Sequence, residues 1–483
     1  MRHPDLEADY VIVGAGATGL SFADAMLTSS DASMILIDRR HKPGGHWNDA
    51  YPFVRLHSPS ATYGVDSTPL GEDSVDADEP ASGFGERASA AEICAYFDRV
   101  LHRRLLASGR VTFLPLSDYA DGGEVTSLVN GARRTVRARR RVVDATLAGT
   151  RVPATHPPEF LVDSEAWCVS PDELLRIARP VGGYVVIGAG KTAMDTVVWL
   201  QRQGVDPDSI AWVRPRDPWL LNRGRLQPSL PFFGSTLGGF AAEMEAARDA
   251  DSIDELFARL EALGQVRRID PSVAPTMFRC AIVSDDELEL LRRVKRVIRL
   301  GHVRAITADR IVLDGGTVPT GPDIVHVHCT TDGIPKIQPR PVFAPGHIAI
   351  QYVRRCAPVL SAALIAKVEA LPENDAFKNE LCAPVTLPNV PLDWLRMAVQ
   401  EAQNAAAWRR VPALKVWLAE SRLNGYATLA ERGMQVPTPE REALVERYSK
   451  ARQSGLARLA QLLMEHPPAA STRDRREAEE ALT

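Results

Sequence analysis

The chain has 483 residues, of which 45% are hydrophobic and 24% are charged, and these proportions are those of a soluble globular protein. At about 150 residues per domain, this length predicts about three structural units. With 57 Lys and Arg against 61 Asp and Glu, the net charge of -4 excludes a large basic field for nucleic acid or for an anionic membrane. We therefore expect a small molecule as the partner, with no nucleic acid and no membrane.

The 6 cysteines are spread along the chain, and none forms a Cys-x-x-Cys pair. This spacing indicates neither a thiol-disulfide redox centre nor a zinc site, so we expect no bound metal. No apolar run approaches the ~20 residues of a membrane span. The first predicted strand starts at Tyr10, which leaves no room for a signal peptide. Together these features favour a reducing, cytoplasmic location.

The chain opens with a strand, a glycine turn, a helix and a second strand within about 30 residues. Strand Tyr10–Val13 runs into Gly14-Ala-Gly-Ala-Thr-Gly19, and Asp38 follows the second strand. In such a turn the first glycine permits the tight bend, the second lets the backbone approach a pyrophosphate, and the third allows close helix packing. A carboxylate at position 38 can accept hydrogen bonds from both ribose hydroxyls. The residues predicted to bind this dinucleotide are Gly14, Gly16, Thr18, Gly19, Asp38 and Arg39.

A second unit with the same order of elements starts at strand Tyr184–Ile187, which runs into Gly188-Ala-Gly-Lys-Thr-Ala193. Where the first unit carries an acid, this unit has Arg214 and Arg216 after its second strand. A guanidinium matches the geometry of a phosphate, so this unit is predicted to prefer NADPH over NADH. The alternative is that both arginines lie on a solvated loop. The residues predicted to bind NADPH are Gly188, Gly190, Lys191, Thr192, Arg214 and Arg216.

Two dinucleotide units in one chain indicate that electrons pass between two dinucleotides. The acidic first site fits FAD, and the basic second site fits NADPH. Between the two units, residues 39–67 are rich in Gly, Pro, His and aromatic residues without clear periodicity. A long loop of this kind in a compact domain is usually functional.

Two segments of this loop region, Asp38–Trp47 and Tyr51–His57, carry a family resemblance when taken with the glycine motifs. The chain resembles the flavin-containing, Baeyer–Villiger and N-hydroxylating enzymes, which are class B flavoprotein monooxygenases, over roughly residues 8–370. The resemblance implies that residues 44–47 run beside the flavin and that His57 replaces an Asn or Asp near its reactive face. It also implies that segments 144–146 and 329–333 cross between the two units. The further cofactor contacts that it implies are Gly45, His46, Trp47, His57, Thr146 and Asp332.

The sequence departs from the family in two places. The stretch Phe-x-Gly-x-x-x-His-x-x-x-Trp/Tyr is not present before the second turn, where Gly149, His156 and Trp167 occur at other spacings. The type of monooxygenase therefore stays open. His57 also changes the local chemistry, because an imidazole can donate, accept or act as a base near neutral pH. The alternative is that His57 only hydrogen-bonds a carbonyl in its loop.

The resemblance implies an FAD- and NADPH-dependent monooxygenase. NADPH would pass a hydride to FAD, and O₂ would form a C4a-(hydro)peroxyflavin that oxygenates a small organic substrate by N-, S- or Baeyer–Villiger-type chemistry. We expect His57 and Ser58 to hydrogen-bond the flavin or the peroxide, and Arg55 to support charge nearby. One alternative is an NAD(P)H-dependent flavin oxidase or reductase that dehydrogenates an amine or imine and releases H₂O₂. Another is a non-catalytic flavin-bound protein that acts in binding or assembly.

The predicted fold class is α/β, with two Rossmann-like dinucleotide-binding domains, a helical insertion and a helical C-terminal segment. The predicted domains are 1–155 for the first part of the FAD domain, 156–324 for the NADPH domain with a helical insertion at about 227–300, 325–385 for the second part of the FAD domain, and 386–470 for the C-terminal helices. Residues 471–483 are expected to form a disordered tail. Helices are expected over 88–106, 253–263, 286–298 and 357–371, and segments 220–300 and 385–440 are expected to line the substrate cavity. A homodimer is compatible with an enzyme of this size.

Overall fold

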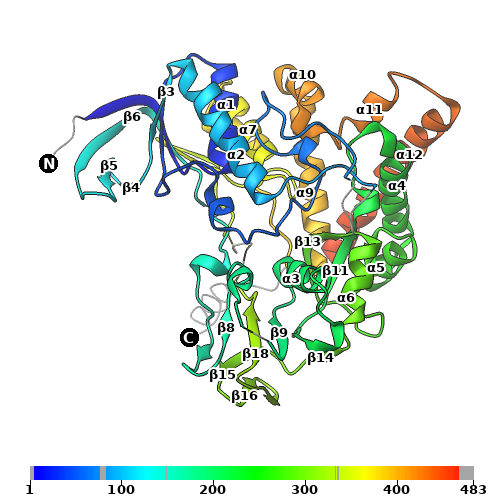
Figure 1. The fold of residues 1–483 in the computed structure, drawn as a ribbon. Coiled ribbons are helices and arrows are strands. Elements are labelled where there is room, and N and C mark those ends of the chain that lie inside the picture. The colour runs from blue at the N-terminus through cyan, green and yellow to red at the C-terminus, as the bar shows by residue number, and fades with distance from the viewer. Residues whose placement is uncertain are drawn as a thin grey trace, which may run out of the picture.

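The computed structural model describes residues 5–76, 83–147, 149–179, 181–331, 333 and 337–466. Two β-sheets with parallel central strands lie one beyond the other, and a group of helices packs beside them (Figure 1). This is the predicted α/β class with two Rossmann-like halves. The predicted tail at 471–483 lies outside the described residues.

The first sheet has the strand order β19-β20-β6-β1-β2-β3. Its parallel strands are β1 (Leu6–Val13), β2 (Met34–Ile37), β3 (Val111–Leu114), β6 (Arg133–Asp144) and β20 (His347–Ala349). The antiparallel additions are β4 (Ser117–Ala120) and β5 (Glu124–Ser127) beside β6, and β19 (Phe343–Ala344) beside β20. Because β20 pairs with β6, two distant stretches of the chain build this sheet.

Helices α1 (Ala17–Ser29) and α7 (Pro358–Glu369) pack against each other on this sheet. Both are apolar over most of their surface because they are buried on nearly all sides. The Ser21 hydroxyl of α1 donates to the Val359 carbonyl of α7 over 2.8 Å. Helix α2 (Ala90–Val100) starts at a capping box in which Ser89 and Glu92 satisfy each other's backbone amides. The helix predicted over 88–106 is confirmed, because α2 continues as a π-helical stretch over Leu101–Leu105.

The second sheet has the order β14-β10-β9-β18-β8, with all neighbours parallel. Its strands are β8 (Cys168–Val169), β9 (Gly183–Ile187), β10 (Ile210–Val213), β14 (Arg296–Ile298) and β18 (Ile324–His328). Helix α3 (Lys191–Arg202) follows β9. The predicted boundary assigns residues from 325 onward to the FAD domain, whereas β18 pairs with β8 and β9 in this second sheet. Val325 and Val327 are fully buried in this strand between β9 and β8, which is what a central parallel strand requires.

The helix predicted over 286–298 is also too long. Helix α6 (Asp285–Arg293) begins at a second capping box, formed by Ser284 and Glu287, and ends before Val294. The β-branched residues that follow join β14, which pairs with β10. Such residues fit a pleated sheet better than a helix when a strand edge is within reach.

An insertion and the C-terminal helices form the third group. The insertion contains β11 (Pro218–Asn222), β12 (Val266–Arg267), β13 (Met277–Val283), α4 (Phe233–Asp249) and α5 (Ile253–Ala262). The C-terminal helices are α8 (Asp375–Leu381), α9 (Pro391–Arg409), α10 (Pro412–Glu420), α11 (Leu429–Gly433) and α12 (Pro439–Glu465). A smaller sheet is made of β7 (Leu161–Val162), β15 (Val303–Ile306), β16 (Arg310–Leu313) and β17 (Gly316–Pro319). Helix α12 lies along α4 (Figure 1), and none of the described helices is long and apolar enough to cross a membrane.

Candidate cofactor and active site

The first glycine turn lies at the carboxyl edge of the first sheet. Gly14 follows β1 with φ of 104°, a left-handed conformation that favours glycine. A Cβ on Gly19 would lie 1.9 Å from the Gly14 carbonyl oxygen, so only glycine fits there. Gly16 precedes α1 and faces the backbone of Gly45, to which its Cβ would come within 3.6 Å. The turn thus has the tight bend and bare backbone that a pyrophosphate needs.

Asp38 lies beside this turn at the end of β2. Its carboxylate accepts hydrogen bonds from the Ala15 amide over 2.6 Å and from the Arg40 amide over 2.7 Å. These bonds hold the side chain, which is 7% exposed, at the edge where a ribose would lie. Arg39 points elsewhere, because its side chain is 72% exposed and pairs with Asp118 over 2.8 Å.

Two threonines join the turn to the end of β6. The Thr18 hydroxyl donates to the Ala145 carbonyl over 3.3 Å. The Thr146 hydroxyl donates to Asp144 over 2.6 Å, and its methyl group would lie 3.1 Å from a Cβ on Gly14. The structure therefore brings both residues to the turn. The other predicted crossing residue, Asp332, lies outside the described residues.

The segment that the resemblance places beside the flavin crosses over this turn. The Gly44 amide donates to the Ala15 carbonyl over 2.9 Å, and a 3₁₀ helix over Gly45–Asp49 follows. Trp47 donates its indole N–H to the Tyr63 hydroxyl over 2.7 Å. Burial and the nearby Arg40 charge lower the pKa of His46 to about 4. His46 is therefore neutral at physiological pH.

The second glycine turn repeats this arrangement on the second sheet. Gly188 has φ of 129°, and its carbonyl accepts the indole N–H of Trp212 over 2.7 Å. A Cβ on Gly190 would meet nothing within 4 Å, so the N-terminus of α3 opens onto free space. Lys191 forms an ion pair with Asp195 one turn further along α3, and the Thr192 carbonyl accepts from Thr196. This end of the helix can accept a phosphate.

Arg214 lies at the same edge, but it is buried. It is 1% exposed, its Nε donates to Asp217 over 2.9 Å, and it stacks over Trp212. The alternative of a solvated loop is therefore wrong for Arg214. Burial lowers the pKa of Arg214, and its Nη1 has no hydrogen-bond partner among the described residues. Arg216 is only partly buried and contacts the Met277 sulfur at 3.7 Å.

Arg299 is a second arginine at this edge that the sequence patterns did not single out. It follows β14 as Arg214 follows β10, and the Arg214 amide bonds to the Ile298 carbonyl beside it. Its guanidinium shares Asp217 with Arg214 over 3.1 Å, and its Nη1 also has no partner among the described residues. A position directly after a β-strand was the signal that could have identified it.

The loop that follows the first turn docks onto the helix that follows the second. The Tyr51 hydroxyl donates to Asp195 of α3 over 2.8 Å. Phe53 stacks on Trp199 of α3, with ring centroids 4.8 Å apart and planes inclined by 15°. Burial and the Asp195 charge raise the pKa of Tyr51 well above its usual value. The two nucleotide-binding units therefore meet at one junction.

His57 lies in this junction, and its backbone is held by a buried ion pair. Arg223 donates to the His57 carbonyl over 2.5 Å and to Glu287 over 2.7 Å. Arg87 lies 3.7 Å from Glu287, and both arginines are at least nine-tenths buried. Burial, together with the Lys191 and Arg223 charges, lowers the pKa of His57 to about 3. Its ring is therefore neutral.

The other two predicted catalytic residues lie on the same segment. Arg55 donates to the Arg87 carbonyl over 2.9 Å, and Ser58 is partly buried beside His57. The sequence patterns singled out neither Arg223 nor Glu287. The capping box at Ser284 and Glu287 is a local pattern, whereas the pairing of Glu287 with Arg223 joins residues 64 positions apart.

The low pKa values of the two histidines predict a pH dependence of stability. Unfolded histidines take up a proton below about pH 6.5, whereas His46 and His57 stay neutral in the fold down to about pH 4 and 3. The unfolded chain therefore binds more protons in this window, and stability falls as the pH is lowered, by up to about 1.4 kcal/mol per pH unit for each ring. Urea unfolding of the variant carrying His46→Gln and His57→Gln should show a smaller loss than the wild type between about pH 6.5 and 4.5. The control is His102→Gln at a side chain that is 60% exposed, and an equal loss in the double variant would contradict the assignment.

A cavity of about 140 Å³ lies between the insertion, the segments that flank β19 and β20, and the segment before α9. It is lined by residues that include Arg279, Gln351, Tyr352, Val385, Leu387 and Asn389. The wall residues 279 and 385–389 come from the two segments that were expected to line a substrate cavity. Burial raises the pKa of Tyr352 to about 12, so its hydroxyl stays protonated.

Residues 12–65 match the NAD(P)-binding Rossmann-like domain family. "Uncharacterized protein Rv2000" of Mycobacterium tuberculosis is 45% identical over 458 residues, which are 95% of this chain and 85% of that protein, and "Uncharacterized protein Mb2023" of Mycobacterium bovis is equally similar. Among solved structures, a flavin-containing monooxygenase from Stenotrophomonas maltophilia aligns at 16% identity and a TM-score of 0.46, over 76% of this chain and 97% of that one. An NADP⁺-bound cyclohexanone monooxygenase from Rhodococcus sp. Phi1 aligns at 14% identity and a TM-score of 0.48, over 89% and 98%.

Proposed function

The chain belongs to the same family as Rv2000 of Mycobacterium tuberculosis, and we propose that it is an FAD- and NADPH-dependent monooxygenase that uses O₂ to oxygenate a small organic molecule. The observation that carries this proposal is the junction at which Tyr51, from the loop after the first turn, bonds Asp195 on the helix after the second. Hydride transfer between two dinucleotides requires that their binding edges share one enclosed space. The Tyr51–Asp195 contact supports this arrangement, because it joins the loop of the first unit to the helix of the second.

The residues at both edges fit the two cofactors. FAD would be held by the turn from Gly14 to Gly19 and by Asp38, and bound FAD would supply the hydride-accepting and oxygen chemistry. NADPH would be held by Gly188, Gly190 and the N-terminus of α3. The two Nη1 atoms without partners, on Arg214 and Arg299, support a 2′-phosphate, because a buried cationic donor without a partner is costly and an anion would satisfy it.

His57, Ser58 and Arg55 are proposed to act at the reacting end of this space. Arg223 fixes the His57 backbone, and the low pKa of His57 keeps its ring neutral, so the ring can both donate and accept one hydrogen bond. The buried Arg87 and Arg223 place positive charge beside it, which favours negative charge on a reacting oxygen. In His57→Ala, the share of consumed NADPH that appears as H₂O₂ should rise at least several-fold. An unchanged share would contradict the role of His57.

Two measurements on the purified protein test the proposed function. The protein should be yellow, and NADPH should bleach its colour in the absence of oxygen, whereas a colourless or unbleached protein contradicts a flavin enzyme. The reduced protein is then mixed rapidly with O₂. A transient absorbance distinct from that of oxidised and reduced flavin supports oxygenation. Direct return of oxidised flavin with stoichiometric H₂O₂ supports the oxidase alternative instead.

The cofactor preference gives a separate prediction. Arg216→Ala is expected to raise KM for NADPH about tenfold and leave KM for NADH unchanged, since losing one charge-assisted hydrogen bond costs about 1.5 kcal/mol. Arg214→Ala should also raise the ratio of KM for NADPH to KM for NADH. It should destabilise the fold as well, because buried Asp217 would keep only Arg299 as its partner. Steady-state kinetics with both nucleotides check this result. If neither variant changes the ratio, the 2′-phosphate binds elsewhere.

A further inference from the structure

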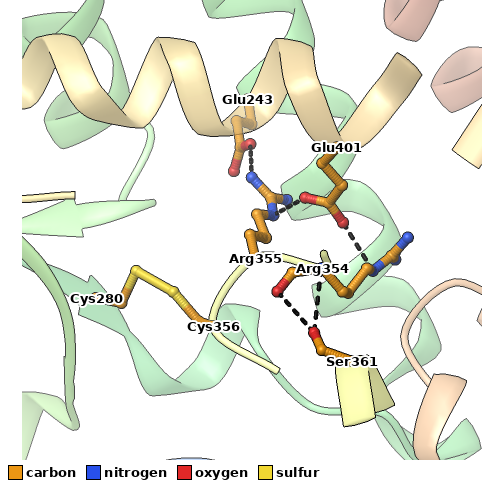
Figure 2. The surroundings of a disulfide bond; sticks show 7 residues. All are labelled: Glu243, Cys280, Arg354, Arg355, Cys356, Ser361 and Glu401. Carbon is orange, nitrogen blue, oxygen red and sulfur yellow. Dashed lines mark hydrogen bonds and ion pairs between the residues drawn. A yellow bond between two sulfur atoms is a disulfide. The ribbon is translucent and has the colours of Figure 1, made fainter. Parts of the chain in front are cut away.

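We propose that Cys280 and Cys356 form a reversible redox site that closes under peroxide and ties the insertion to the loop before α7. A disulfide joins these residues across 76 positions of sequence (Figure 2). Cys280 belongs to β13, and Cys356 lies between β20 and α7. The sequence spacing signalled no thiol-disulfide redox centre, but the fold brings these two distant cysteines together.

Both cysteines have a backbone conformation that L-residues rarely adopt. Cys280 has φ of 54° and Cys356 has φ of 49°. Among the described non-glycine residues, only Asp73 and Leu116 share the left-handed region. Such conformations persist only where the surrounding contacts hold them, and they cluster at functional sites. Both ends of the disulfide are therefore held by the fold around them.

Contacts from three helices hold the Cys356 side (Figure 2). Arg355 pairs with Glu401 of α9 over 2.8 Å and with Glu243 of α4 over 3.6 Å, while Arg354 pairs with the other Glu401 oxygen over 2.8 Å. Ser361 of α7 accepts the Arg354 amide over 3.2 Å. These contacts do not involve the sulfur atoms, so they do not depend on the S–S bond itself.

Different contacts hold the Cys280 side. The Phe278 amide donates to the Asn389 carbonyl over 3.1 Å, and the Arg279 guanidinium donates to the Asn389 side chain over 2.8 Å. Arg279 and Asn389 line the 140 Å³ cavity, and so does Tyr352, which lies near Cys356 in the sequence. The disulfide therefore connects segments that form different walls of this cavity. Its state sets how far these walls can separate.

The pair is the cysteine site that a soluble oxidant can reach most readily. Cys356 is exposed and Cys280 is partly buried, whereas Cys329 and Cys382 are buried, and burial raises the pKa of Cys329 to about 12. A thiol reacts through its thiolate, so a raised pKa slows oxidation. The remaining free cysteines, Cys94 and Cys168, are each partly buried and have no disulfide partner in the described chain.

The chemistry of closing and opening balances with a peroxide and a dithiol. One thiolate attacks H₂O₂, the O–O bond breaks, and water leaves as a sulfenic acid forms. The second thiol attacks that sulfur, which forms the S–S bond and releases a second water, so two thiols lose two electrons and two protons to one H₂O₂. A dithiol reductant opens the bond by thiolate attack, and its own sulfurs become the disulfide.

Peptide mapping of the wild-type protein tests the site without any variant. The protein is reduced with dithiothreitol, one half is treated with H₂O₂, and both halves are alkylated, digested and analysed by mass spectrometry. The Cys280 and Cys356 peptides should be alkylated separately in the reduced half and cross-linked in the oxidised half, and renewed dithiothreitol should release them. Free alkylation of both residues after peroxide, or over-oxidation without a cross-link, overturns the proposal.

Hydrogen exchange tests the effect on the cavity. Amides in 277–283, 351–357 and 384–389 should exchange at least several-fold more slowly in the oxidised than in the reduced wild type. Cys280→Ser should show no difference between the two treatments, and the matched control Cys94→Ser should behave like the wild type. A cross-link without slower exchange overturns the inference that the disulfide controls the cavity walls. These readouts do not depend on flavin turnover, so the proposed monooxygenase function and this site can fail separately.

Discussion

Gly19→Ala is expected to yield a protein without bound flavin and with a free energy of unfolding lower by about 3 kcal/mol. The added Cβ would lie 1.9 Å from the Gly14 carbonyl oxygen and 3.1 Å from its carbonyl carbon. These are backbone atoms at the end of the buried strand β1, so they cannot rotate away. Helix α1 would have to move off the turn, and the pyrophosphate cradle would open.

A matched control separates this clash from the general effect of replacing a helical glycine. Gly234 lies in α4, and a Cβ there would meet nothing within 4 Å. Gly234→Ala should therefore keep its flavin and be stabilised by up to about 1 kcal/mol through helix propensity. Flavin absorbance of the purified proteins and urea unfolding measure both effects. A yellow Gly19→Ala protein with the wild-type unfolding midpoint would show that α1 does not pack on the turn as described.

Arg223→Met is expected to lower the free energy of unfolding by about 3–5 kcal/mol, because it leaves the charge of Glu287 buried without its close partner. Arg223 is 1% exposed and also holds the His57 and Ile282 carbonyls. The methionine fills a similar volume, so the loss comes mainly from the unpaired carboxylate and carbonyls. NADPH oxidation should fall as well, because His57 loses its backbone anchor.

A surface pair provides the control for this prediction. Arg447 and Glu245 form a bridge in which the side chains are 48% and 27% exposed, so Arg447→Ala should cost less than about 1 kcal/mol. The double variant Arg223→Met with Glu287→Leu should recover part of the loss, because no charge then stays buried. Urea unfolding of the four proteins measures the coupling. If the single and double variants are equally unstable, Glu287 is not the source of the loss.

The Arg223–Glu287 pair also makes the stability of the protein depend on pH, in a direction that can be predicted. Glu287 is buried, which by itself raises a carboxyl pKa, but the Lys191, Arg223 and Arg87 charges hold it well below its usual range. A lowered pKa in the fold adds stability that is present above the unfolded value, about 4.3, and is lost as the pH falls. In Arg223→Met this contribution should shrink, so the penalty of the substitution should be smaller near about pH 4 than at pH 7.

The sequence could predict those features that arise from contacts within a few residues. The turns Gly14–Gly19 and Gly188–Ala193, with Asp38 after the second strand, depend on local backbone conformation, and the structure places each at the carboxyl edge of a parallel sheet. The first strand of each nucleotide-binding unit and the helices at 253–262 and 358–369 were visible for the same reason. The domain boundaries and the site roles stay predictions, and β18 shows why boundaries are hard. A buried apolar strand fits either sheet until its neighbours are known.

By itself, the sequence determined that this chain carries two nucleotide-binding turns, the first followed by an acid and the second by arginines. Only the tertiary structure decided that Arg214 is buried against Asp217, that Arg223 holds both Glu287 and the loop of His57, and that Cys280 meets Cys356. The physical reason is separation along the chain. Tyr51 and Asp195 are 144 positions apart and Arg223 and His57 are 166 apart, so no local pattern records their contact. Packing of the two sheets and the insertion into one junction creates these partners, and it sets the charge and burial that govern their chemistry.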